Sequence, residues 1–88
     1  MYIVVSYDIS SDCASKVRRH CAQYLTPVQR SVFEGEIAEK KLRSLKRMIA
    51  GLIDPGRDSV IIYNLEPYAS IRKESIGRIA AAGSEYVE

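Results

Sequence analysis

The chain has 88 residues, of which 47% are hydrophobic, and its formal net charge is only +2. This length fits one small domain over residues 1–88, with its core in about residues 1–76, and the hydrophobic content is too high for a disordered segment. No apolar stretch approaches the roughly 18 residues of a membrane span, and the start does not resemble a secretory leader, so we expect a cytoplasmic protein.

The first predicted element is a strand over residues 2–7, because the run YIVVSYD is rich in β-branched and aromatic residues. The cluster Ser10, Ser11 and Asp12 predicts a turn in which one of these side chains caps the next helix. Asp8 lies between the strand and the helix, where α/β proteins commonly place functional side chains.

A helix is predicted over about residues 12–25. Its apolar residues recur at spacings of three and four, at Ala14, Val17, Cys21 and Tyr24. His20 falls on the other side, and we expect it to be a surface residue without a function. Cys13 and Cys21 would lie about 12 Å apart along this helix, too far for a disulfide, and no Cys or His spacing resembles a zinc site.

The rest of the chain predicts three strands and one helix. Residues 28–33 are expected to form a strand that continues through a bend at Gly35 to Ile37. A helix over about residues 38–53 stops at the sequence Asp-Pro-Gly, and residues 59–65 (SVIIYNL) form the next strand. Residues 71–76 predict a short charged strand, and residues 80–83 a loop.

This order predicts an α+β fold, a ferredoxin-like β-α-β-β-α-β sandwich with an extra C-terminal strand and both helices on one face of the sheet. The first strand and the strand from Ser59 are apolar on both faces, but two helices cover only one. Because no element remains for the second face, we expect a homodimer that packs sheet against sheet. The segment 66–88 is expected at the dimer interface or at a partner interface.

Asp8 is the main candidate for chemistry. A carboxylate at this point can bind Mg²⁺, which prefers oxygen ligands, and Mg²⁺ would orient water and offset charge on a scissile phosphate. One carboxylate is a thin site, so Asp12 or the Asp8 of a second copy is a second candidate ligand. The alternative is that Asp8 only accepts hydrogen bonds from backbone N–H groups in the turn.

Basic residues are unevenly distributed along the chain. Positions 16–47 hold nine of them against three acids, which favours phosphate binding but also suits a solvated helix surface. The candidates for phosphate contact are Lys16, Arg18, Arg19 and Arg30, since a guanidinium can contact phosphate in a bidentate manner. The second helix contributes a group that suits phosphates or solubility equally well: Lys40, Lys41, Arg43, Lys46 and Arg47. Ser31 and Phe33 share a strand face, and Phe33 is expected in the core.

Three stretches resemble the CRISPR-associated protein two (Cas2) family: MYIVVSYDIS at the start, YLTPVQRSVFEGEI at residues 24–37 and DSVIIYNL at residues 58–65. The resemblance covers about residues 1–76. It implies a homodimer in prokaryotic cytoplasm that works with the CRISPR integrase in spacer acquisition, bridging and positioning new DNA through backbone contacts. It also implies a magnesium-dependent endonuclease that acts on single-stranded RNA or double-stranded DNA.

The resemblance assigns roles to particular positions. The acidic residue of the family at the end of its first strand maps onto Asp8, with a catalytic and magnesium-binding role, and the SVF segment maps onto Ser31 and Phe33. Many relatives have an aromatic residue where this chain has Arg30, so contacts of that aromatic do not carry over. Two functions therefore stand side by side: a metal-dependent endonuclease, and a non-catalytic dimeric DNA-binding adaptor in which Asp8 is structural. The basic middle of the chain argues against a third, a metabolite-binding regulatory domain.

Overall fold

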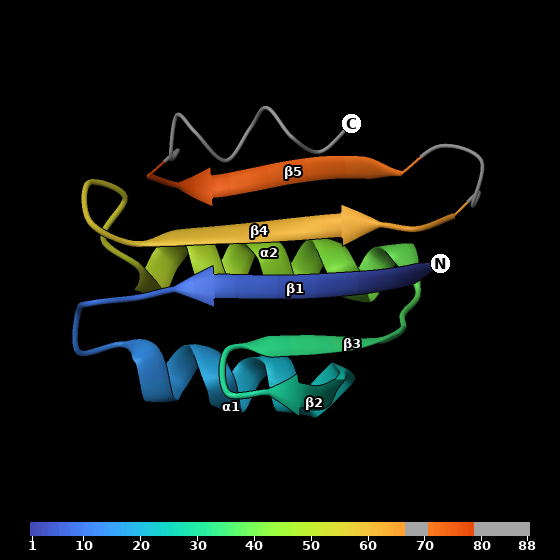
Figure 1. Ribbon diagram of the computed structural model, residues 1–88, viewed down its shortest axis with the longest axis horizontal. Helices are drawn as coiled ribbons and strands as arrows, with labels where there is room; N and C mark the ends of the chain where they lie inside the picture. The colour runs from blue at the N-terminus through green and yellow to red at the C-terminus, as the bar shows by residue number, and fades with distance from the viewer. Residues whose placement is uncertain (67–70, 79–88) are drawn as a thin grey trace.

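The fold is one five-stranded antiparallel sheet with two helices packed behind it (Figure 1). The structure is a computed structural model and describes residues 1–66 and 71–78. The elements in chain order are β1 (Tyr2–Asp8), α1 (Ala14–Tyr24), β2 (Thr26–Gln29), β3 (Val32–Glu36), α2 (Glu39–Leu52), β4 (Ser59–Asn64) and β5 (Arg72–Gly77). Within the described residues, neither helix is long and apolar enough to cross a membrane.

The strand order is β2-β3-β1-β4-β5, and every neighbouring pair is antiparallel. The predicted ferredoxin-like arrangement with an added C-terminal strand is therefore confirmed, including the short charged strand, which the structure places one residue later than expected. Residues 80–83, expected as a loop, and most of the segment expected at an interface lie outside the described residues.

The core lies between the sheet and the helices. Because side chains alternate along a strand, β1 points Ile3 and Val5 toward the helices, and β4 does the same with Val60 and Ile62. The helices contribute residues at spacings of three and four: Val17 and Cys21 from α1, and Leu42, Leu45 and Ile49 from α2. Each fully buried aliphatic side chain of this kind stabilises the fold by about 1.5–3 kcal/mol.

The opposite face of the sheet, which we call the open face, carries the alternate residues. On β1 and β4 the larger side chains of this face are Tyr2, Val4, Ile61 and Tyr63, all only partly buried, and Ser6, Asp8 and Ser59 complete it. This face looks toward the viewer in Figure 1, with both helices behind the sheet. No helix among the described residues covers it, so the sheet-to-sheet homodimer stays a prediction.

The segment 28–33 and the start of α1 differ from the sequence prediction. Residues 28–33 do not form one strand: a turn at Arg30 and Ser31 divides β2 from β3, because the pair Gln29↔Val32 closes a two-residue hairpin connection there. Ser31 is therefore not on a strand. The predicted side-chain cap is also wrong, since Cys13 is the N-cap of α1 and makes no side-chain cap hydrogen bond.

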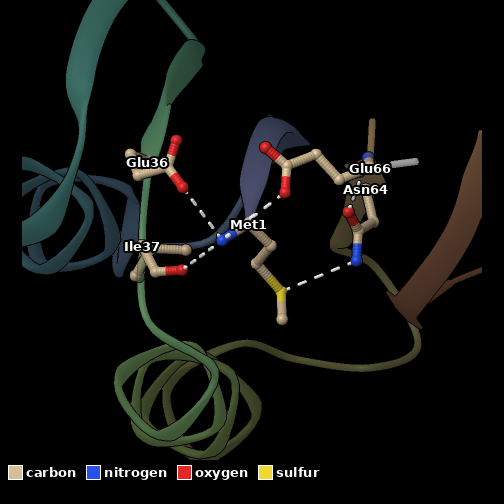
Figure 2. A network of polar contacts seen from close by, with 5 residues as sticks. All are labelled: Met1, Glu36, Ile37, Asn64 and Glu66. Atoms are coloured by element: carbon tan, nitrogen blue, oxygen red, sulfur yellow. Dashed lines mark hydrogen bonds and ion pairs between the residues drawn. The ribbon is translucent and has the colours of Figure 1, made fainter. Parts of the chain in front are cut away.

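The N-terminal amino group fixes the start of the central strand (Figure 2). It donates to the Glu36 carboxylate and to the Ile37 carbonyl oxygen, both at 3.1 Å, and lies 3.9 Å from the Glu66 carboxylate. The Met1 thioether sulfur accepts a hydrogen bond from the Asn64 side chain at 3.5 Å. Met1 therefore joins the C-terminal ends of β3 and β4, at the end of the sheet opposite to that of Asp8.

Candidate functional site

A groove of about 420 Å³ opens at the carboxyl end of β1. The antiparallel pairing Ser6↔Val32 brings the β2–β3 turn to this end of β1, and α1 begins from the same side. The groove is lined by Tyr7, Asp8, Ile9, Ala14, Ser15, Arg18, Arg30 and Ser31. Four candidate residues from three separate elements, Asp8, Arg18, Arg30 and Ser31, thus line one groove.

Asp8 is the last residue of β1 and its side chain is 80% exposed. One of its carboxylate oxygens lies 3.4 Å from the guanidinium of Arg78, which follows β5. The adjacent residue, Tyr7, donates its backbone N–H to the Ser31 carbonyl oxygen at 3.1 Å. The strand therefore holds Asp8 in place while leaving its carboxylate accessible to a ligand.

Tyr7 forms an apolar wall of the groove. Its ring stacks on Phe33 with a centroid separation of 6.4 Å, and its hydroxyl contacts the Arg30 carbonyl oxygen at 3.4 Å. Burial raises the pKa of the Tyr7 hydroxyl, with a further increase from Cys21 and an opposing effect from Arg18. The hydroxyl is therefore neutral at physiological pH. Phe33 itself is 1% exposed and belongs to the core, as expected.

Burial makes Cys21 a poor nucleophile. Cys13 and Cys21 are both free, in agreement with the prediction that they form no disulfide. Burial raises the pKa of the Cys21 thiol to about 11, so the reactive thiolate is scarce at neutral pH.

Asp58 is the residue at this end of the sheet that sequence reasoning missed. Its side chain is fully buried just before β4 and accepts hydrogen bonds from the backbone N–H groups of Ser10, Ser11 and Asp54 at 2.9, 3.3 and 2.9 Å. The Ser11 hydroxyl donates a fourth at 2.7 Å. Asp58 thus ties the loop after Asp8 to the α2–β4 loop.

These donors also fix the charge of Asp58. The hydrogen bonds from the Asp54 backbone and the Ser11 hydroxyl, supported by those from Ser10 and the Ser11 backbone, hold the pKa of the carboxyl far below its usual range and outweigh burial, which acts in the opposite direction. The sequence carries a signal for this residue, because Asp58 is an acid between a Pro-Gly turn and an apolar strand, at the start of the DSVIIYNL motif.

The other basic candidates lie outside the groove. Lys16 and Arg19 are exposed on α1, but helical rotation of about 100° per residue turns both away from the direction of Arg18. On α2, Lys46 pairs with Glu74 at 2.8 Å and Arg43 with Glu39 at 3.6 Å. The remaining basic residues of α2, all exposed, are Lys40, Lys41 and Arg47.

The surface position predicted for His20 is wrong. The residue is half-buried, and its Nδ1 atom is buried without a hydrogen-bond partner. The position of His20 on α1 agrees with this partial burial, because the buried Val17 and Cys21 lie three residues before and one residue after it.

The side chains at the groove indicate which kind of metal ion could bind there. In the part of the chain that the structure describes, no three His, Cys, Asp or Glu side chains converge, and Asp12 is exposed without lining the groove. Mg²⁺ keeps several waters and is usually held by one or two carboxylates together with substrate phosphates. One exposed carboxylate beside serine hydroxyls and arginines fits such a hydrated ion, not a cage built by one chain.

Comparison with known proteins gives one consistent result. A family model described as CRISPR associated protein Cas2 matches residues 1–70. A protein of Thermodesulfovibrio yellowstonii named CRISPR-associated endoribonuclease Cas2 3 is 43% identical over 76 residues, which cover 86% of each chain. A crystal structure of Cas2 superposes with a TM-score of 0.68 at 35% identity, covering 72% of this chain and 71% of the other. The crystal structure of Streptococcus pyogenes Cas2 gives 0.55 at 26% identity, covering 100% and 96%.

Proposed function

Because the chain belongs to the CRISPR-associated protein Cas2 family, we propose that it is a Mg²⁺-dependent endonuclease that cleaves RNA or DNA in the groove beside Asp8. The observation that carries this proposal is that Asp8, Arg18 and Arg30 line one groove although they come from three separate elements. The endoribonuclease name of the relative from Thermodesulfovibrio yellowstonii supports phosphodiester cleavage as the reaction class.

Five residues of the groove have a role in this proposal. Arg18 and Arg30 contact the non-bridging oxygens of a backbone phosphate, for which their planar guanidinium groups are suited. Asp8 holds Mg²⁺, which when bound would orient water and offset charge on the phosphate. The neutral Tyr7 ring gives the groove a wall without competing charge. The Ser31 hydroxyl is a donor to a phosphate oxygen.

The biological setting that we propose is CRISPR adaptation. Two copies pack through their open faces, which bury Val4 and Ile61, and the dimer joins the CRISPR integrase during spacer acquisition. The support is the apolar character of a sheet face that no helix of the described residues covers. In this arrangement the dimer bridges the integrase copies and positions new DNA through phosphate contacts.

A second candidate function is that of a non-catalytic DNA-binding adaptor. Two observations favour it: the carboxylate of Asp8 is already paired with Arg78, and Lys16 and Arg19 are exposed cations outside the groove. Such cations bind backbone phosphates without any need for cleavage.

Replacement of Asp8 separates the two functions. We expect Asp8→Asn to lower Mg²⁺-dependent cleavage of single-stranded RNA or duplex DNA on the order of a hundredfold, because metal-ion stabilisation of the transition state is worth several kcal/mol. Asp12→Asn is the matched control, since it removes the same charge four residues away from an exposed position outside the groove.

The outcomes are distinct. Unchanged cleavage by Asp8→Asn, or an equal loss in Asp12→Asn, contradicts a catalytic Asp8. If Asp8→Asn loses cleavage but still supports spacer integration with the integrase, the adaptor is the biological role. Loss of integration with normal DNA binding favours chemistry at Asp8.

A further inference from the structure

We propose that Arg78 is a built-in counter-cation of Asp8, and that its guanidinium competes with a divalent metal ion for this carboxylate. The inference rests on the proposed function, in which Asp8 is the metal ligand, and it adds a regulation of that site. The starting observation is the 3.4 Å separation between Arg78 Nη2 and Asp8 Oδ2.

Arg78 is held in this place by two hydrogen bonds besides the ion pair. Its backbone N–H donates to the Asp58 carbonyl oxygen at 2.7 Å, and its Nε–H donates to the Arg57 carbonyl oxygen at 3.2 Å. Its side chain is 40% exposed, half the exposure of the Asp8 side chain. The guanidinium is therefore anchored at its base and directed at the carboxylate, unlike a lysine or arginine that is free in solvent.

The sheet register explains why Arg78 meets Asp8. Asp8 pairs with Ser59 on β4, and Ser59 pairs with Gly77 on β5, so the three residues form one row across the sheet. Arg78 is the next residue after this row. Gly77 has φ +91, a left-handed conformation that β-strand residues other than glycine rarely adopt, and this bend redirects the chain at Arg78.

We call the Arg78–Asp8 ion pair the latch, because it opposes metal binding and can be opened by a metal ion. A guanidinium does not lose its proton in proteins, so the positive charge faces Asp8 at every physiological pH. Within the described residues, no group of three His, Cys, Asp or Glu side chains converges at Asp8 to offset that charge. An exposed ion pair is worth only about a few-fold in an equilibrium constant, so a divalent cation can displace the guanidinium. The latch weakens metal binding without abolishing it.

The test is a Mn²⁺ titration at low ionic strength, read by the electron paramagnetic resonance signal of free Mn²⁺. We expect Arg78→Gln to bind Mn²⁺ roughly fivefold more tightly than the unchanged protein, because one competing positive charge is removed at contact distance. Arg72→Gln is the control, since it removes the same charge from an exposed residue at the other end of β5, where Arg72 pairs with Asn64.

A second readout follows Arg78 directly. In the unchanged protein, added Mg²⁺ should shift the NMR resonance of the Arg78 Nε–H group, and in Asp8→Asn it should not. This measurement needs neither nuclease activity nor the Arg78 variant.

The outcomes separate the latch from the metal site. If Arg78→Gln binds Mn²⁺ no more tightly than Arg72→Gln, or more weakly, while Asp8→Asn abolishes binding, Asp8 remains a metal ligand and the latch is overturned. If Asp8→Asn binds Mn²⁺ as the unchanged protein does, Asp8 is not a ligand, and the metal site and the latch fail together.

Discussion

Asp58 shows how much one buried side chain organises at the residue scale. A buried charge is tolerated only when its hydrogen-bonding capacity is satisfied, and Asp58 accepts from three backbone N–H groups and one hydroxyl. The donors belong to two loops at the end of the sheet where Asp8 lies: the β1–α1 loop and the α2–β4 loop. The residue that supports the candidate site is thus not one of those that line it.

The acid dependence of stability follows from Asp58. Its folded-state pKa lies below its unfolded value, so its charge stabilises the fold above about pH 4, and this contribution is lost as the pH falls further. We expect Asp58→Asn to lower the thermal unfolding midpoint by several degrees at pH 7, because an amide NH₂ then faces N–H donors.

Unfolding followed by circular dichroism between pH 7 and pH 2 measures both effects. The gap between Asp58→Asn and the unchanged protein should narrow at the acid end, because the unchanged protein alone loses the contribution of this carboxylate. Asp12→Asn, at an exposed position, serves as the control. An equal midpoint for Asp58→Asn and Asp12→Asn at pH 7 would contradict the proposed tie between the loops.

At the scale of the element, the end of β5 depends on one glycine. A Cβ at Gly77 would collide with the Asp58 carbonyl oxygen and lie 2.8 Å from Ile53 Cδ1, and the φ of +91 adds backbone strain. We expect Gly77→Ala to destabilise the protein by more than about 1 kcal/mol, because the Asp58 carbonyl is backbone and cannot move aside as the end of a side chain can.

Gly51 provides the opposite case in α2. A Cβ there meets nothing within 4 Å, so Gly51→Ala should stabilise the protein by up to about 1 kcal/mol through helix propensity. Urea unfolding of the two alanine variants gives both free energies. A neutral Gly77→Ala would mean that the bend before Arg78 does not need glycine.

The elements also show what sequence can and cannot predict here. The alternation in β1 and the three-and-four spacing in α2 report local geometry, so strands, helices and core residues such as Ile3 and Leu45 were predictable. The break at Ser31 was not, because Gln, Arg and Ser carry no strong turn signal and the hairpin is closed by pairing between strands. The contacts of Asp58 with the loop after Asp8, and of Arg78 with Asp8 itself, span 45 to 70 positions, which no local pattern reports.

The candidate site was predicted in part for the same reason. Asp8 was identifiable because a carboxylate at the end of an apolar strand is a local signal. Arg18 and Arg30 were named for their charge, but that they share a groove, and that Lys16 and Arg19 do not, is a consequence of tertiary structure. No local feature indicated that Arg78 would reach Asp8.

For the whole molecule, the open face is the surface through which we propose that two copies pair. Ile61 lies on this face in β4, with Tyr63 beside it along the strand. We expect Ile61→Lys to convert a dimer into a monomer at micromolar concentration, because a lysine there would be desolvated between two sheets.

Sedimentation velocity measures this change. Ala22→Lys, at an exposed position of α1 on the helix side, should leave the dimer intact and so controls for added charge. A monomeric unchanged protein would remove the basis for both the homodimer and the bridge between integrase copies.

The shared carboxylate of Asp58 also couples the two connections that it joins. Ser10 and Ser11 in the loop after β1, and Asp54 in the loop after α2, donate to the same carboxylate. If either loop opens, Asp58 loses hydrogen-bond donors, and this weakens the hold of the carboxylate on the other loop. We therefore expect the two segments to fluctuate together, and a ligand that rigidifies the stretch after Asp8 to slow amide exchange at the C-terminal end of α2 as well.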